Sequence, residues 1–315
     1  MTDFVKWRSI GKFPDFVSDC RRNGIQLVDV SSKIKLHGTN GCIRVERDGF
    51  VASSRKTDLH KGTDNSGFRA FVETLKHNYM PSPITFYGEW AGPGIQKKDA
   101  ATKLKEKHFF IFSAYIHGVR YIYDPEELQK YVDTAFLGNE DKNIHVLPWY
   151  SGTRTLNVLD DSELNQFITR IVDHVDTSIS KRDPYIYEKF GVDGPGEGLV
   201  FYATFANDIR MFKVKTKEHS VNGKRKQVIT EKPDGVDDFI ETYVTENRMV
   251  QIHNEEFDGA FDMSNLGRFI GLVLQDTFKE TKNEMELVDF TWKTVQRYAA
   301  PKIRSWFIPN CNKVT

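Results

Sequence analysis

Charged side chains lie beside glycine at four places where the sequence alternates as a β-strand does. Side chains alternate faces along a strand, so each charge points away from its apolar neighbours. Glycine lets a ligand approach the backbone closely, and converging ammonium and carboxylate groups can hold a phosphate chain and a divalent metal ion. The charged residues are Lys35, Glu89, Glu197, Lys213 and Lys215. One such strand alone fits a solvated polar face, whereas four together favour a phosphate-binding site.

Hydrophobic periodicity predicts the elements that must position these charges. Alternating segments predict strands, and apolar residues spaced three and four apart predict helices. The predicted strands cover residues 26–37, 43–51 as a hairpin, 84–89, 107–116, 120–123, 197–203 and 209–215. The predicted helices cover 66–79, 125–134 and 162–179. Beyond residue 235 only helical spacing remains, in 266–278 and in 288–298 up to Pro301, so an α+β body should precede a smaller helical domain.

The composition indicates a folded chain without a membrane segment. The 315 residues are 39% hydrophobic and 28% charged, which excludes a disordered chain. No apolar run reaches the ~18–20 residues that a membrane helix needs, so we expect no membrane partner. Lys plus Arg and Asp plus Glu both number 44, which allows a local basic groove but argues against binding nucleic acid with the whole surface. The three cysteines are too few for a disulfide framework, so we expect a cytoplasmic protein.

Five motifs in one order resemble those of the covalent nucleotidyltransferases, the superfamily of polynucleotide ligases and mRNA-capping guanylyltransferases. Each motif is weak alone, whereas five in the expected order form a strong signal. They are Lys35-Leu36-His37-Gly38, Gly88-Glu89, Phe109-Phe110-Ile111-Phe112, Glu197-Gly198-Leu199-Val200 and Lys213-Val214-Lys215.

Three further features of the sequence resemble one branch of this superfamily, the phage nick-sealing RNA ligases of the RNA ligase 2 type. These enzymes are relatives of the trypanosome RNA-editing ligases. The features are His37 followed by Gly-Thr-Asn, the segment 88–97, and the segment 271–276. The resemblance implies an α+β fold, with a nucleotidyltransferase (ATP-grasp-like ligase) domain of antiparallel sheets and flanking helices at 1–232 and a small all-helical domain at 233–315. It also suggests a phage origin, action in the host cytoplasm, a role in RNA repair and a monomeric state.

The resemblance further implies an ATP-dependent RNA ligase (EC 6.5.1.3) that joins a 3′-hydroxyl to a 5′-phosphate, as at a nick in duplex RNA. Such enzymes attach AMP from ATP to a lysine as lysyl-AMP, pass it to the RNA 5′-phosphate, and release it as the 3′-hydroxyl attacks. Lys35 matches the nucleophile. A free lysine has a pKa of about 10.4, so Lys213, Lys215 and Mg²⁺ must disfavour its charge. We expect Mn²⁺ to substitute for Mg²⁺.

The matched motifs imply roles for the other residues. Glu197 would bind Mg²⁺, because carboxylate oxygens suit a hard cation, and Glu89 would hold the ribose hydroxyl or assist with the metal. Phe112 would stack on adenine, with Phe110 as the alternative. The remaining expected nucleotide or phosphate contacts are Leu36, His37, Asn40 and Arg55. Taken singly, Phe112 also fits a core position and Arg55 a solvated loop.

Two departures from the family pattern and three rival functions stay open. Ile34 stands where this branch has Glu, and Ser113 where the family has Asp, which leaves the choice of ATP over GTP less determined. A DNA ligase or a GTP-dependent capping guanylyltransferase shares the lysyl-nucleotide chemistry, but both normally carry a β-barrel domain where this sequence predicts helices. A catalytically inactive RNA-end-binding protein is the non-enzyme alternative, which the intact motif residues argue against.

Overall fold

The computed structural model describes residues 3–205, 208–219, 235–257, 259–281 and 291–311. The chain divides into two compact units, Met1–Ile229 and Thr230–Thr315, and each is described by itself. The predicted boundary after residue 232 lies outside the described residues, as does most of the predicted linker at 222–237.

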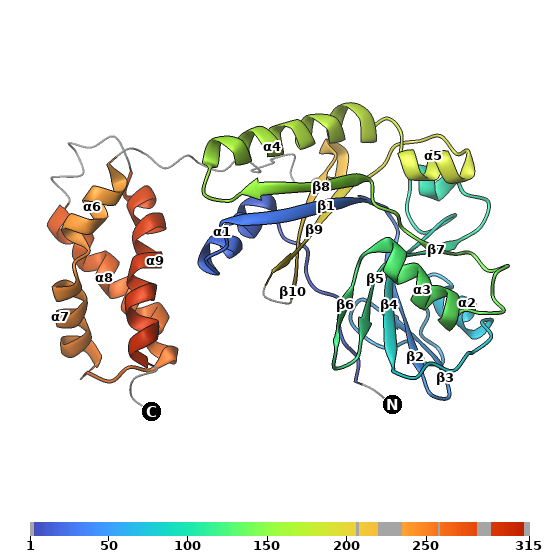
Figure 1. Ribbon diagram of the computed structural model, residues 1–315, viewed down its shortest axis with the longest axis horizontal. Coiled ribbons are helices and arrows are strands. Elements are labelled where there is room, and N and C mark those ends of the chain that lie inside the picture. The colour runs from blue at the N-terminus through green and yellow to red at the C-terminus, as the bar shows by residue number, and fades with distance from the viewer. Residues whose placement is uncertain (1–2, 206–207, 220–234, 258, 282–290, 312–315) are drawn as a thin grey trace. The chain divides into compact units, whose positions relative to one another are not determined.

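Two largely antiparallel sheets form the first unit (Figure 1). The first sheet has the order β10-β9-β1-β8 and the second the order β3-β2-β4-β5-β6, with β7 added in parallel to β5. The strands of the first sheet are β1 (Leu27–Lys35), β8 (Ser151–Asn157), β9 (Gly198–Phe205) and β10 (Asp208–Lys215). Those of the second are β2 (Thr39–Glu46), β3 (Gly49–Ser54), β4 (Ile84–Ala91), β5 (His108–Ile116), β6 (Arg120–Ile122) and β7 (Ile144–Val146).

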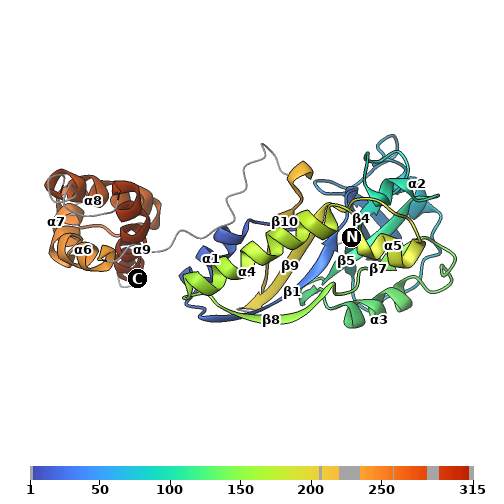
Figure 2. The same ribbon diagram turned by 90° about the horizontal axis from the view of Figure 1, so that it is seen from above.

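Helices pack against both sheets (Figures 1 and 2). They are α1 (Phe13–Arg22), α2 (Phe68–Glu73), η1 (Ala100–Lys103), α3 (Pro125–Ala135), α4 (Asp161–His174), η2 (Val175–Ile179), α5 (Pro184–Phe190) and η3 (Lys217–His219). On the first sheet the Phe13 ring of α1 lies 5.0 Å from that of Phe212 and 5.7 Å from that of Phe167 in α4. The helices α2 and α3 share a second core with β2 to β6. One buried core contains residues of both sheets, among them Ile34 and Phe112, so the strands that carry the charges are held together.

The start and the buried face of α4 agree with its capping residue and with the spacing of its apolar residues. The side chain of Asp160 accepts the N–H of Glu163 at the start of α4. Leu164, Phe167 and Ile168 form its buried face, as their spacing predicts. The predicted helix at 162–179 is therefore confirmed, with η2 as a π-helical final turn.

Two predicted helix ends are wrong. The helix predicted to extend to residue 79 ends at Glu73, because the N–H of Lys76 donates to the side chain of Asn139 (2.7 Å) instead of continuing the helix. The last helix, α9 (Trp292–Cys311), continues through Pro301. Ile303 and Phe307 are fully buried beyond that proline, so packing outweighs the lost backbone hydrogen bond.

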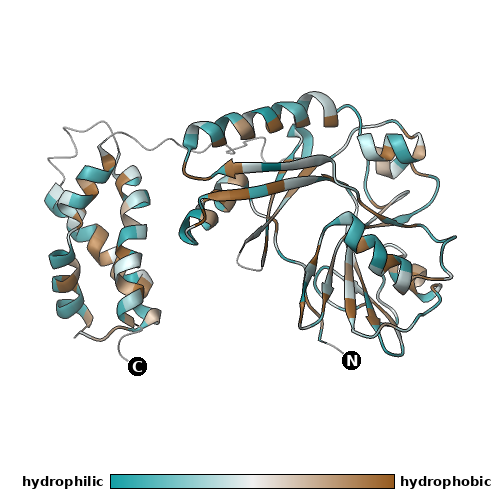
Figure 3. Ribbon diagram, in the orientation of Figure 1, coloured by the Kyte–Doolittle hydropathy of each residue, from teal (hydrophilic) through white to brown (hydrophobic). Residues whose placement is uncertain are grey.

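The second unit is helical throughout its described residues. Its elements are α6 (Val236–Tyr243), α7 (Glu246–Phe257), η4 (Met263–Asn265), α8 (Leu266–Thr281) and α9. Hydrophobic and hydrophilic residues alternate along these helices (Figure 3), and the apolar ones form a separate core that includes Phe239, Phe269 and Phe307. The expected α+β class, with antiparallel sheets followed by a helical C-terminal region, is confirmed. None of the described helices combines the length and apolar character needed to cross a lipid bilayer.

Candidate active site

Three neighbouring strands bring Lys35, Glu197 and Lys215 together. Strand pairing places Lys35 opposite Gly198, and Gly198 opposite Lys215. Because paired residues share a face of the sheet, both lysines project on the same side as the start of β9. Glu197 lies directly before β9, and its carboxylate contacts Lys35 Nζ and Lys215 Nζ at 2.6 Å each. A single buried carboxylate thus bridges two ammonium groups.

Gly198 allows this approach. Its φ is +153°, and a Cβ at this position would lie 2.1 Å from the carbonyl oxygen of Val214. Only glycine lets β9 begin so close to the end of β10. Glycine is therefore required at this position of the motif, because it lets Glu197 reach both lysines.

Glu89 holds the turn that follows Lys35. Its Oε1 accepts the N–H of Gly38 (2.9 Å) and its Oε2 accepts the side-chain amide of Asn40 (3.0 Å). A Cβ on Gly38 would lie 2.4 Å from the carbonyl oxygen of Trp90, so this turn also requires glycine. Burial raises the pKa of Glu89, and the charge of Glu197 adds to the rise, whereas Lys35 opposes it.

The charges around Glu197 shift one another's pKa values. Burial raises the pKa of Glu197, but Lys35 and Lys215 outweigh burial and hold it below its usual value. The pKa of Lys213 is lowered by burial, then by the positive charges of Lys215, Lys35 and Arg55. This corner of the molecule therefore disfavours an additional positive charge and favours an anion.

The lysines and Glu89 line a cavity of about 220 Å³, whereas Glu197, which contacts two of those lysines, is not part of the lining. Its charged and polar lining residues include Lys35, Asn40, Arg55, Glu89, Lys213 and Lys215, and its apolar ones include Trp7, Ile34, Leu36, Phe112, Leu147 and Val200. The cavity thus offers cations and carboxylates together with apolar surface. A nucleotide, which has a flat base and a charged phosphate chain, requires this combination.

A β-bulge sets the position of Phe112. Tyr87 pairs with Ser113 and Gly88 with Ile111, so Phe112 is the extra residue on β5. Its carbonyl oxygen accepts a hydrogen bond from Lys33 Nζ (2.9 Å). Bulges are known to redirect side chains near active sites, and this one places Phe112 on the wall of the cavity.

Lys33 lies behind the cavity wall, bonded to the carbonyl of Phe112, and the sequence assigned it no role. Its side chain is fully buried, and Nζ lies 5.0 Å from the Trp149 ring centre and 5.5 Å from that of Tyr202. Burial lowers its pKa to about 7. The sequence did hold one indication of a role for Lys33, because it lies two residues before Lys35 and on the same face of the strand. The partner that explains it, the Phe112 carbonyl, could not be located from the sequence.

The remaining expected residues are placed as follows. Phe110 packs among His145, Tyr185 and Phe190 and is not part of the cavity lining. Ser113 is buried and donates to the carbonyl of Ile122 (2.6 Å), so it too lies outside that lining. His37 turns towards Asp99, with which it makes a hydrogen bond.

The model of the RNA ligase family matches residues 29–215, more than half of the chain, and the chain belongs to this family.

Solved structures of an RNA ligase from Naegleria gruberi are similar to the chain. A mutant form with AMP and Mn aligns with a TM-score of 0.45 and 18% identity, over 70% of this chain and 58% of that one. The form with pyrophosphate gives the same values, and a mutant with ATP and Mn gives 0.44 and 19% over the same shares. The chain therefore spans less than two thirds of that ligase's length.

Proposed function

We propose that this chain is an ATP-dependent RNA ligase that joins a 3′-hydroxyl to a 5′-phosphate, with nicked duplex RNA as the substrate. The observation that carries the proposal is the pair of 2.6 Å contacts from Glu197 to Lys35 and Lys215, in which Lys35 and Lys215 also line the cavity. Membership of the RNA ligase family supports RNA as the substrate class. The phage origin, cytoplasmic action and monomeric state expected above stay predictions.

Lys35 is the proposed nucleophile. Attack of its amine on the α-phosphorus of ATP forms a P–N bond and breaks the P–O bond to the β-phosphate, so pyrophosphate leaves and the amine gives up a proton to solvent. Lys213 and Lys215 support this step, because their charge offsets the negative charge that grows on the leaving group. The contact with Glu197 fixes the amine in position.

Glu197 is the residue best suited to hold Mg²⁺. Its carboxylate is buried and its pKa is low, and hard cations prefer carboxylate oxygens. Glu89 is the second proposed ligand, and its two oxygens are engaged by the turn after β1 just as those of Glu197 are engaged by Lys35 and Lys215. When bound, the ion would supply positive charge beside the phosphates, and Mn²⁺ is expected to serve in its place.

The apolar wall is the proposed base site. Phe112 would stack on adenine, and Leu36 would contact the nucleotide beside it. Asn40 and Arg55 lie at the charged part of the lining and are proposed to contact phosphate or the RNA end. After transfer of AMP to the RNA 5′-phosphate, attack by the 3′-hydroxyl forms the phosphodiester bond and releases AMP. Duplex RNA is recognised mainly by its shape and phosphates, so we expect binding to weaken as salt rises.

A sealing assay tests the proposal. A nicked RNA duplex labelled at its 5′-phosphate is incubated with the protein, ATP and Mg²⁺, and the products are separated by length. The proposal expects sealed strand and, early in the reaction, adenylated RNA. Faster sealing of nicked DNA would support a DNA ligase, and use of GTP alone would support a capping enzyme. Binding of RNA ends without sealing or adenylation would leave only the inactive binding protein.

A further inference from the structure

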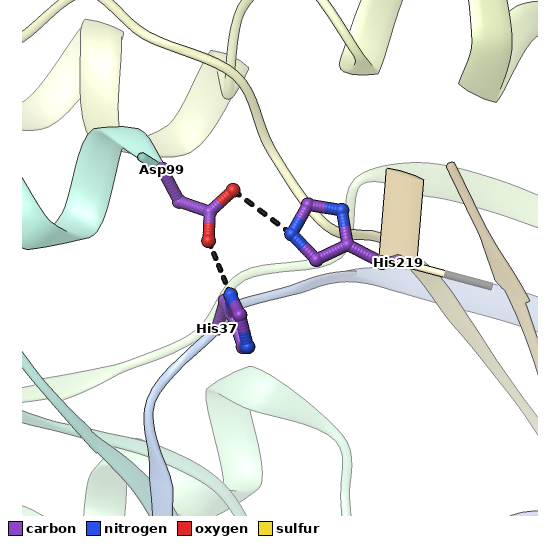
Figure 4. Close-up of side chains that lie close together, drawn as sticks. All are labelled: His37, Asp99 and His219. Carbon is purple, nitrogen blue, oxygen red and sulfur yellow. Dashed lines mark hydrogen bonds and ion pairs between the residues drawn. The ribbon is translucent and has the colours of Figure 1, made fainter. Parts of the chain in front are cut away.

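Three side chains from separate segments of the first unit meet in one place (Figure 4). His37 lies in the turn after β1, Asp99 directly precedes η1, and His219 ends η3. His37 Nδ1 is hydrogen-bonded to Asp99 Oδ2, and His219 Nε2 lies 3.0 Å from Asp99 Oδ1. One potential ligand atom from each residue lies within 4.8 Å of those of the other two. We refer to these residues as the His–Asp–His cluster.

The protein holds Asp99 and His219 in place. Thr102 donates to the carbonyl of Asp99 (2.7 Å), and the N–H of Ala100 donates to the carbonyl of Pro195 (2.9 Å), which fixes the segment around the carboxylate. His219 Nδ1 is hydrogen-bonded to Thr216 Oγ1 (2.6 Å), which leaves Nε2 directed at Asp99. Histidines that bind metal ions usually make such a hydrogen bond through their other nitrogen, because it fixes the ring orientation and the tautomer.

The buried carboxylate of Asp99 has one oxygen, Oδ1, that can accept a further bond. Its side chain is only 3% exposed. Within the described part of the chain, Oδ1 accepts no hydrogen bond of good direction, although His219 Nε2 lies 3.0 Å from it. A buried carboxylate oxygen in this state is costly unless a cation or donor completes it.

We propose that the His–Asp–His cluster binds one transition-metal ion of the Zn²⁺ class. Two imidazole nitrogens and one carboxylate oxygen form a known zinc ligand set, which leaves a further position for water or another ligand. Imidazole favours Zn²⁺ over Mg²⁺, so this site differs chemically from the all-oxygen site proposed at Glu197. The proposal does not depend on the ligase activity.

Binding requires only a small contraction of the cluster. Tetrahedral Zn²⁺ with ligands at about 2.0–2.1 Å holds its ligand atoms about 3.3 Å apart, and the widest separation here is within 4.8 Å. The His37 side chain is 28% exposed and the His219 side chain 13%. The partly exposed His37 therefore offers the ion a path from solvent. A bound ion would link the turn after Lys35 to η3, which follows Lys215.

A second pair of histidines provides a matched control. His108 Nδ1 lies 2.9 Å from His145 Nε2, so two imidazoles meet there as well. Among the described residues this pair is not part of any group of three potential ligands, whereas the His–Asp–His cluster is. Zinc should therefore distinguish the two places.

The test is a metal titration of the full chain after chelator treatment. Zn²⁺ binding is measured by calorimetry, and Co²⁺ binding by its visible absorption, which reports coordination. The wild type is expected to bind one ion with a dissociation constant in the micromolar range or tighter. His219→Gln keeps an amide that can contact Asp99 but removes the ligand, so affinity should fall about tenfold or more. Asp99→Asn should have the same effect.

His145→Gln and the exposed-site variant His60→Gln should bind Zn²⁺ as the wild type does. Circular dichroism of each variant separates lost ligands from lost folding. Absence of Zn²⁺ binding by the wild type would overturn the proposal, as would unchanged affinity in folded His219→Gln. Loss of binding in His145→Gln alone would assign the ion to the other pair and also overturn it.

Discussion

Lys33 should make the stability of the protein depend on pH in a defined window. Burial lowers its pKa from 10.5 to about 7, so in the native state it loses its proton above neutral pH, while in the unfolded chain it keeps the proton up to the ordinary lysine pKa. Between these two values unfolding takes up a proton, and stability therefore rises with pH. Below about pH 7 both states are protonated, and this stabilisation is lost.

The size of the effect follows from the shift. Each pKa unit corresponds to about 1.4 kcal/mol, so the free energy of unfolding should rise by about 1.4 kcal/mol per pH unit above pH 7. From about pH 7 to about pH 9 the gain is about 3 kcal/mol, and over the full window about 5 kcal/mol. Cation–π contacts with Trp149 and Tyr202 act on the charged form and reduce these values.

The measurement compares the wild type with Lys33→Met by urea unfolding at several pH values. Methionine fills a similar volume without a proton to exchange, so the stability difference between the two proteins should change in favour of the wild type as pH rises. Lys105→Met, at an exposed position, is the matched control and should show a difference independent of pH. A flat difference for Lys33→Met over this range would refute the reasoning and indicate that Lys33 remains charged in the folded protein.

Three further changes test the site. Glu197→Gln should slow nucleotidyl transfer about 100-fold or more, since it removes the charge between two ammonium groups; an activity close to wild type in a rapid-quench assay would contradict this. Gly198→Ala should lower the free energy of unfolding by at least ~3 kcal/mol, because its Cβ would meet backbone at 2.1 Å. Gly24→Ala, with φ +70° and open space, should cost only about 1 kcal/mol, and equal costs in thermal unfolding would refute the role of Gly198. Phe112→Leu should weaken ATP binding about tenfold, whereas Phe110→Leu should not; the reverse order in calorimetry would assign the base site to Phe110.

Much of the first unit could be predicted because its strands alternate. The segments around Lys35 and Lys213 have one apolar and one charged face, and the pairing of β1, β9 and β10 follows that pattern. The strand β8 was not predicted, because most of its residues are exposed and its apolar and polar residues do not alternate. The helix ending at Glu73 was predicted too long because the group that ends it, Asn139, lies far along the chain.

The site was harder to predict than the strands that carry it. Alternation alone could not decide between Phe110 and Phe112, because the bulge at Phe112 changes which residue reaches the cavity. Nor could it connect His37 with Asp99 and His219, since these contacts join three segments far apart in sequence. The order of the motifs identified the charged residues. The residues that they contact could be found only in the folded structure.

The proposed ligase chemistry begins with nucleotidylation of the Lys35 amine. The most direct measurement is peptide mass spectrometry after incubation with ATP and Mg²⁺ without RNA, under neutral conditions that preserve a P–N bond. We expect one AMP adduct, located on Lys35 and absent from Lys35→Arg. An adduct on another residue, or an unmodified protein that still seals RNA, would contradict it.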